Sequence, residues 1–537
     1  MKAKLLLIVC AVFFMSSVQA QELNYERGEL LVQLTKDQSL LDISSEFGDV
    51  QIQDSKLISK TLNIWKLVFN DNVITEQQAI SEMYRHADVQ VAQLNHKVSL
   101  RIDPNDAQFG SQWQYFQAND KDIDAPEAWD ISTGGMTMNG DEIVVGVVDN
   151  GYNLNHEDLV DNIWINTEEI AGNGIDDDAN GYIDDVNGWN AYNSNGNVTS
   201  AGHGTAVAGI VGAKGDNGIG VTGVNWDVKV MTIQGSSGNE GTVLEAYNYI
   251  LDSRIAYNTS GGTEGSFVVA TNASFGIDFG QPEDSPLWCD MYDTLGQNGI
   301  LSCGATINGN FDVDDVGDVP TACPSEYLIA VTNTNINDEK VTSAGYGLTT
   351  IDLGAPGAGT FTVSQSGYGG FGGTSGATPH VTGTIALMYS SPCQQLADLA
   401  MSDPELTVQL IRDFILDNVD PNTSLEGITV TGGRLNVNNA MVSLNEACNT
   451  LAVLDLDTEG TIVLYPNPAS ELLNIQTQNN QKIETVQIFD LTGKMISNKQ
   501  DVQSNAIGIS ELTPGAYIVS VKFEDSDAPF NKMFIKR

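Results

Sequence analysis

Three short segments of the 537-residue sequence contain residues that together could perform nucleophilic catalysis. Asp149 ends the run V-V-G-V-V-D, His203 lies in A-G-H-G-T-A-V, and Ser375 lies in G-T-S-G-A-T-P-H. A serine hydroxyl is a weak nucleophile near neutral pH, and the common solution is a histidine base that a third group holds in place. The combination predicts acyl transfer through a serine nucleophile.

The choice among the histidines rests on local context. The chain has five of them: His86, His96, His156, His203 and His380. Only His203 stands between glycines at the start of an apolar, small-residue segment, which predicts a ring at the beginning of a helix packed tightly on a sheet. The alternative for this residue is a buried structural histidine.

Asp149 and Ser375 each have a functional and a structural interpretation. A carboxylate at the carboxyl end of a buried parallel strand lies where active sites gather in open α/β sheets, although a lone aspartate there is more often a cap or turn residue. Glycines around Ser375 let the backbone approach a substrate, and the dipole of the following helix favours negative charge. The alternative is an ordinary N-cap serine.

Taken together, the three segments resemble the subtilisin-like serine peptidase family, in the order Asp, His, Ser that subtilisin itself has. The resemblance covers roughly residues 101–450. It implies that Ser375 attacks the scissile carbonyl, that His203 takes its proton, and that Asp149 orients the ring and stabilises the imidazolium.

The sequence departs from the family pattern at three positions. Asn150 stands where the family usually has Thr or Ser, and Gly376 stands where it usually has Met. The family's oxyanion donor is an asparagine after a small-residue strand, and G-I-L-S-C-G-A-T-I-N-G-N places Asn308 in that role. Ile307 replaces the usual glycine before it, and Asn310 is the competing candidate.

The segment N-A-S-F-G resembles the strand that pairs with an extended substrate in this family. Ser274, Phe275 and Gly276 would line the cleft, partly through backbone groups, so the expected substrate is a polypeptide in extended conformation. The alternative is an ordinary buried strand end.

An acidic loop over residues 173–187, N-G-I-D-D-D-A-N-G-Y-I-D-D-V-N, predicts a structural Ca²⁺ site. Oxygen ligands at alternate positions are typical of a calcium loop, and adjacent carboxylates repel each other without a cation. Because Asn187 stands where a bidentate Glu is expected, Asp185 is a substitute ligand. The alternative is a solvated acidic loop. The full set of expected ligands is Asp176, Asp178, Asn180, the Tyr182 carbonyl, Asp184 and Asp185.

The elements that must position these residues alternate between strands and helices over residues 101–450. Apolar runs near Ile143–Val148, Val228–Ile233, Phe267–Ala270 and Leu328–Val331 predict strands buried on both faces. Segments 244–257 and 379–389 predict helices. The fold class is therefore α/β, a doubly wound and mostly parallel sheet, as the resemblance also implies.

Residues 21–100 predict a separate α+β unit. Strands are expected over 29–34, 62–69 and 89–94, with helices near 40–47 and 75–84. The order βαββαβ, which has one strand more than these segments mark, indicates a ferredoxin-like sandwich. Its position resembles that of the pro-segment of subtilisin-like peptidases, which implies a folding aid and intramolecular inhibitor of the chain's own cleft. The alternative is a permanent adaptor domain.

The first 20 residues predict a signal peptide. Lys2 and Lys4 precede the apolar stretch 5–15, and cleavage is expected after Ala20. No other segment has this character, so we expect no membrane anchor. Five cysteines remain after the signal, and we expect the pairs Cys289–Cys323 and Cys393–Cys448 with Cys303 left free; a metal site is the alternative.

Residues 451–460 form an acidic linker, and 461–537 predict a small β-sandwich. The segments Y-P-N-P-A-S-E-L-L-N-I, V-Q-I-F-D-L-T-G-K-M-I and L-T-P-G-A-Y-I-V-S-V resemble the type A sorting domain of Bacteroidetes type IX secretion. This implies the type IX machinery as a partner and export through the periplasm to the medium or cell surface. A carbohydrate-binding or adhesive module is the alternative.

The net charge of the chain excludes one class of function. Acidic residues outnumber basic ones by 70 to 24, a net charge of −46, which excludes the basic footprint of a nucleic-acid-binding protein. The sequence therefore predicts a secreted serine endopeptidase. The alternative from another class is a catalytically inactive surface-binding protein that keeps the fold.

Overall fold

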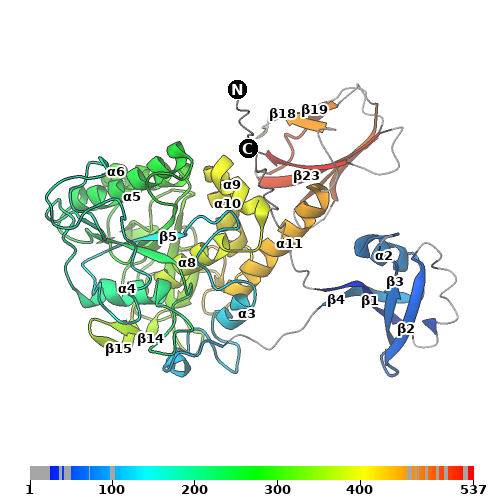
Figure 1. Cartoon of the computed structure of the whole chain (residues 1–537), viewed down its shortest axis with the longest axis horizontal. Helices are drawn as coiled ribbons and strands as arrows, with labels where there is room; N and C mark the ends of the chain where they lie inside the picture. Colours follow the sequence, from blue (N-terminus) through cyan, green and yellow to red (C-terminus); the bar gives the residue numbers. More distant parts are fainter. Residues whose placement is uncertain are drawn as a thin grey trace, which may run out of the picture. The chain divides into compact units, whose positions relative to one another are not determined.

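The computed structural model divides the chain into two compact units, residues 1–100 and 101–537, each of which is described by itself (Figure 1). The predicted signal peptide lies outside the described residues. Those residues are 25–35, 39–40, 47, 50–71, 73–96, 103–455, 462–465, 469, 471–477, 482–490, 495–500, 506–513, 515–523 and 530–536.

The N-terminal unit is an antiparallel sheet with the strand order β2-β3-β1-β4, which is the ferredoxin-like arrangement expected from the sequence. Alternate apolar side chains of β1 and β3 are buried beneath helix α2, whose start has the capping box of Thr75 and Gln78. Most of the helix expected near 40–47 lies outside the described residues. The elements are β1 (Tyr25–Leu34), β2 (Ile52–Ser59), β3 (Ile64–Phe69), α2 (Glu76–Met83) and β4 (Val89–His96).

The second unit is built on a nine-stranded sheet with the order β16-β17-β13-β12-β10-β8-β5-β7-β6. All neighbouring strands are parallel except β16 and β17, which confirms the predicted doubly wound α/β fold. The strands are β5 (Val144–Asp149), β6 (Gly188–Asn190), β7 (Lys229–Gln234), β8 (Val268–Ala273), β10 (Leu301–Ala305), β12 (Leu328–Thr334), β13 (Leu353–Pro356), β16 (Asp420–Pro421) and β17 (Gly433–Arg434).

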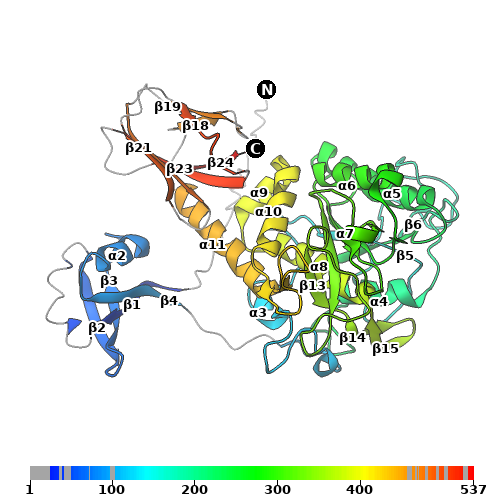
Figure 2. The same ribbon diagram turned by 180° about the vertical axis from the view of Figure 1, so that it is seen from behind.

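Two hydrophobic cores cover the two faces of this sheet. Val145 and Val147 of β5 belong to one core, whereas Val144 and Val148 belong to the other, because successive side chains of a strand point to opposite faces. Helices α5 (Glu240–Ser260) and α6 (Pro286–Gln297) lie on one side, and α4 (Gly202–Gly212) and α8 (Thr374–Tyr389) lie on the other (Figure 2). A strand buried from both sides must be apolar throughout, which explains the runs seen in the sequence.

Further helices and strands pack around this sheet. Helix α11 extends into the expected linker because Leu451 to Leu454 continue a helix-forming sequence; residues 456–460 lie outside the described chain. These elements are α3 (Ala125–Trp129), β9 (Ile277–Asp278), α7 (Val313–Val316), β11 (Asp318–Val319), β14 (Ala358–Ser364), β15 (Gly367–Gly372), α9 (Gln394–Ser402), α10 (Pro404–Leu416) and α11 (Val437–Asp455).

The C-terminal segment contains two antiparallel sheets, β18-β19-β22 and β21-β20-β23-β24, around a shared apolar core. This is the small β-sandwich expected from the alternating pattern. Its strands are β18 (Ile462–Tyr465), β19 (Leu472–Thr477), β20 (Ile483–Asp490), β21 (Met495–Gln500), β22 (Ala506–Gly508), β23 (Gly515–Phe523) and β24 (Phe530–Lys536).

Two disulfides join the pairs predicted from the sequence. Cys289 is bonded to Cys323, and Cys393 is bonded to Cys448, with Cα–Cα distances of 5.2 and 5.7 Å. Cys303 is free and buried. Within the described ranges, no helix is both long and apolar enough to cross a membrane.

Candidate active site

Asp149 is the last residue of β5, a central strand of the sheet that pairs on both sides with parallel neighbours. Its carboxyl group therefore lies at the carboxyl edge, where loops and helix starts converge. The residue is only 1% exposed, and the backbone N–H of Asn150 donates to Oδ1 over 2.7 Å. A buried carboxylate needs such donors, because burial of an unpaired charge is costly.

His203 is the second residue of α4, and its Nδ1 lies 2.9 Å from both carboxyl oxygens of Asp149. The close approach of α4 to β5 requires glycine at 204, since an added Cβ would lie 2.4 Å from the Gly151 carbonyl oxygen. A carboxylate can only accept, so the proton is on Nδ1. In the neutral ring, Nε2 then carries the lone pair that a general base needs.

Asp149 also controls the charge of the ring. Burial lowers the pKa of His203, but the hydrogen bond and the negative charge of Asp149 outweigh it, and the net result is a pKa above the ordinary value of 6.5. The ring of Phe371 contacts the imidazole edge-on, with centroids 5.2 Å apart. The ring is thus held on two sides.

Ser375 is the second residue of α8, a helix whose every residue is buried. Pro379 lacks the N–H that would bond the Ser375 carbonyl one helical turn earlier. The hydroxyl of Ser274 donates to that carbonyl instead, over 3.1 Å, and the Ser375 hydroxyl donates to the Ser274 carbonyl over 3.2 Å. In the described structure no hydrogen bond joins Ser375 to His203.

Of the two candidate asparagines, Asn308 lies beside Ser375. Its Oδ1 accepts from the backbone N–H of Thr374 over 3.1 Å, so the amide nitrogen is the group left to donate. Asn310 lies elsewhere, where its Oδ1 accepts from Lys340. Ile307 departs from the usual glycine because its side chain fills a small apolar core of its own.

The other two departures have local explanations. The Asn150 side chain accepts from the N–H of Gly204 over 3.4 Å, which links the end of β5 to α4. At position 376, even a Cβ would lie 3.2 Å from the Gly357 carbonyl oxygen, so this backbone accommodates glycine better than a long side chain.

A cavity of about 90 Å³ opens beside Ser375. The predicted substrate-binding residues Ser274, Phe275 and Gly276 line it together with Asn308. Sequence reasoning did not reveal the two acidic residues that also line it, Asp278 and Asp318. Nothing in their local sequence marks them, because the pairing of β9 with β11 brings them together.

Comparison with known proteins fixes the family. Residues 140–442 match the model of the subtilase family of peptidases, which is more than half of the chain. The chain belongs to the subtilase family. Subtilisin-like protease 1 of Plasmodium berghei is 28% identical over 319 residues, which are 55% of this chain and 49% of that protein.

Bacterial relatives are similarly distant. An extracellular protease of Xanthomonas campestris is 29% identical over 350 residues, 60% of this chain and 56% of that protein. The major intracellular serine protease of Bacillus subtilis is 29% identical over 300 residues, 54% of this chain and 80% of that protein. The subtilase chain described here thus spans about half the length of the Plasmodium and Xanthomonas relatives.

Residues 463–536 match the model of a secretion system C-terminal sorting domain. This match covers the β-sandwich at the end of the subtilase chain and indicates secretion. It agrees with the resemblance of the three tail segments to the type A sorting domain of type IX secretion.

The acidic loop brings together a different set of carboxylates from the one that its spacing suggested. Ligand oxygens of Glu169, Asp178 and Asp185 lie within 4.8 Å of one another. Asp185 is fully buried and accepts from the Tyr249 hydroxyl over 2.6 Å, and burial raises its pKa. Glu169 lies outside the loop pattern, so alternate spacing could not reveal it.

The remaining predicted ligands stabilise the loop itself. Asp176 accepts from the backbone N–H groups of Asn180 and Gly181, and Asp184 accepts from those of Asn173 and Gly174. The Asn180 amide donates to both Asp178 and Asp185.

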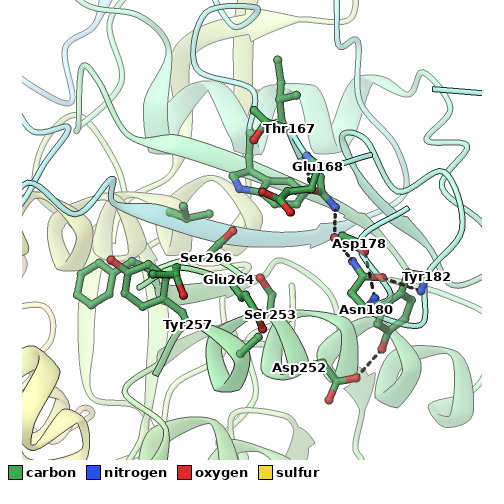
Figure 3. A pocket seen from close by; sticks show the side chains of 18 of the residues that line it. Thr167, Glu168, Asp178, Asn180, Tyr182, Asp252, Ser253, Tyr257, Glu264 and Ser266 are labelled. Atoms are coloured by element: carbon green, nitrogen blue, oxygen red, sulfur yellow. Dashed lines mark hydrogen bonds between the residues drawn. The ribbon is translucent and has the colours of Figure 1, made fainter. Parts of the chain in front are cut away.

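The loop forms one end of a larger cavity of about 480 Å³ (Figure 3). Figure 3 shows Asn180 directed at Asp178, and Tyr182 directed at Asp252. Five carboxylates line this cavity and no Lys, Arg or His does: Glu142, Glu168, Asp178, Asp252 and Glu264.

The position of His203 against Asp149 predicts a measurable titration. In the native protein the imidazole should titrate above 6.5, and Asp149→Asn should lower its pKa because the charge that stabilises the imidazolium is lost. NMR titration of selectively labelled histidine measures both values. An unchanged His203 titration in the variant would contradict the coupling.

Proposed function

We propose that the protein is a secreted serine endopeptidase that hydrolyses peptide bonds with Asp149, His203 and Ser375 as its catalytic residues. The observation that carries the proposal is the buried carboxylate of Asp149, 2.9 Å from Nδ1 of a histidine whose Nε2 remains a free base. Membership of the subtilase family and the cavity beside Ser375 support it.

Each residue has one role in the proposed reaction. Oγ of Ser375 attacks the scissile carbonyl carbon while Nε2 of His203 takes the hydroxyl proton, and the imidazolium is stabilised by Asp149. When the C–N bond breaks, the same proton passes from Nε2 to the leaving amine. A water molecule then repeats the sequence on the acyl-enzyme. To begin, the Ser375 hydroxyl must turn from the Ser274 carbonyl towards His203.

Asn308 is the proposed oxyanion donor. Because its Oδ1 is engaged by Thr374, its Nδ2 can donate to the negative oxygen that forms when Ser375 attacks. The polypeptide substrate would lie extended along Ser274, Phe275 and Gly276, which line the same cavity.

Calcium is the cation that the acidic loop fits best. The donors of Glu169, Asp178 and Asp185 are all carboxylate oxygens, which hard cations prefer. Among the described residues no lysine or arginine forms an ion pair with any of the three, and one of them is fully buried. Bound calcium would neutralise this charge and hold the loop to the body of the fold, with Asn166 and Asn180 as neutral neighbours.

Roles for the separate segments of the chain follow from their position and from the family. We propose that residues 1–20 direct export, that 21–100 act as the chain's own inhibitor and folding aid, and that 101–450 form the peptidase. The compact unit within residues 1–100 supports a separately folding pro-segment. The match over 463–536 supports the type IX machinery as the partner that carries the protein across the outer membrane.

An inactive binding protein is the alternative. Such a protein would have no need to retain the Asp149–His203 pair, the cavity at Ser375 or the oriented Asn308. All of these are present, so the enzyme is the better proposal.

Ser375→Ala should abolish peptide cleavage and leave the melting temperature nearly unchanged. The expected loss is on the order of 10⁶ in kcat, because no other hydroxyl takes over the attack. Hydrolysis of a mixed peptide library, followed by mass spectrometry, measures the loss. Turnover within about tenfold of the parent would remove Ser375 from its role.

Asn308→Ala should lower kcat by roughly 10²–10³ with little change in KM, because the donor acts chiefly when the oxyanion forms. Asn310→Ala is the matched control and should keep nearly full activity. If Asn310→Ala shows the larger loss in steady-state assays, the donor has been assigned to the wrong residue.

Removal of calcium should lower the melting temperature, and its return should restore it, since a ligand bound only to the folded state stabilises by about 2.7 kcal/mol at a hundred times Kd. Asp185→Asn should abolish this response in differential scanning calorimetry. Asp177→Asn is the control, as that carboxylate only caps loop groups. A response that survives Asp185→Asn but is lost in Asp176→Asn would favour the set expected from spacing.

Deletion of residues 461–537 should leave the enzyme active but held in the periplasm. The tail has its own core and contains none of the catalytic residues. Fractionation of the host, with activity assayed in each fraction, measures the effect. Arrival of the truncated enzyme in the medium would show that the tail is not the sorting signal.

A further inference from the structure

The cavity beside Ser375 has an acidic wall. Asp278 and Asp318 line it, and no lysine, arginine or histidine is among its lining residues. The two carboxylates are direct partners in the antiparallel pair of β9 and β11, where Asp318 stands opposite Asp278. Residues directly opposite each other project from the same face of such a pair, and like charges placed there destabilise it. The repulsion between the two carboxylates therefore costs free energy unless a cation lies between them.

The two carboxylates differ in depth. Asp318 is 1% exposed, whereas Asp278 is exposed at the rim. Within the described ranges neither forms an ion pair with a basic residue. Burial raises the pKa of Asp318, hydrogen bonds lower it, and the charge of Asp278 raises it further.

Asp318 is also fixed in orientation. Its Oδ2 accepts three hydrogen bonds, from the Thr321 hydroxyl over 2.6 Å and from the Thr306 hydroxyl and the Ile307 N–H over 2.9 Å each. All three go to one oxygen, which leaves Oδ1 as the acceptor for a ligand. A fixed buried carboxylate recognises a cation more strongly than a mobile surface one.

Three of the residues that line the cavity have apolar side chains. Phe275, whose ring stacks on Trp288, lines it together with Ala305 and Ile307. One water requires roughly 10–15 Å³ of such space. At about 90 Å³ the cavity therefore has room for several atoms. An apolar stem with a cationic end is the chemistry of lysine and arginine side chains.

We propose that this cavity receives the side chain of the residue preceding the scissile bond, and that Asp318, assisted by Asp278, selects lysine or arginine there. The proposal rests on the proposed peptidase function. Ser375 and Asn308 line the same cavity, so the carbonyl under attack belongs to the residue whose side chain enters it. The stem packs along Phe275, and the cationic end lies at Asp318.

A competing interpretation is that Asp318 only ties β11 to Thr306 and Ile307. A structural anchor would affect all substrates equally. A specificity residue changes the ratio between basic and neutral substrates, so the ratio is the quantity to measure.

The test uses protein produced from the full chain and peptides that differ only in the residue before the cleaved bond: Lys, Arg, norleucine or Glu. We expect kcat/KM for Lys or Arg to exceed that for norleucine by about tenfold or more. Asp318→Asn should reduce this ratio by about tenfold while cleavage after norleucine stays within about threefold. Asp278→Asn, at an exposed position that tolerates change, should reduce the ratio less. Asp284→Asn, an exposed neighbour outside the cavity, should leave it unchanged.

A binding measurement separates this proposal from the peptidase function. Titration calorimetry on Ser375→Ala protein, with peptides ending in Lys or norleucine, should show tighter binding of the Lys peptide, and Asp318→Asn should remove the difference. Equal binding, or equal cleavage after Lys and norleucine in the parent, overturns the specificity proposal even if the enzyme is active. Preferential binding of Lys without any cleavage supports it and contradicts the peptidase function instead.

Discussion

The ion pair between Asp149 and His203 is the interaction on which the rest of the site depends. A carboxylate that is 1% exposed is stable only if donors surround it, and here they are the Asn150 N–H and Nδ1 of His203. This requirement places α4 against β5 closely enough that only glycine fits at 204. It also fixes the tautomer, which leaves the lone pair on Nε2 available as a base.

Much of the fold could be predicted because buried positions are apolar and follow the periodicity of their strand or helix. The continuous apolar run of β5 and the alternating pattern of β1 were readable for this reason. Strand β2 was not assigned, because most of its side chains are exposed and no apolar period marks it. Helix α8 begins at Thr374, five residues before the predicted segment, since Gly376 and Pro379 obscure its first turn.

In the candidate site too, some residues could be predicted from the sequence and others could not. Asp149, His203, Ser375 and Asn308 stand in short motifs, so the sequence could offer them together. Glu169 could not be found in this way because it precedes the acidic loop and falls outside its alternate spacing. Asp318 could not be found because it reaches the cavity beside Ser375 through the pairing of β11 with β9. Local spacing predicts groups that act from one loop or one helix start. It cannot predict those that distant segments bring together.

The most direct test of the central claim is where a fluorophosphonate attaches to the native protein, and whether His203 is needed. The account predicts one label per chain, carried by the peptide that contains Ser375, and loss of labelling in folded His203→Ala, because the hydroxyl is reactive only beside its base. Attachment at Ser274, which lines the same cavity, or undiminished labelling without His203, would contradict the assignment.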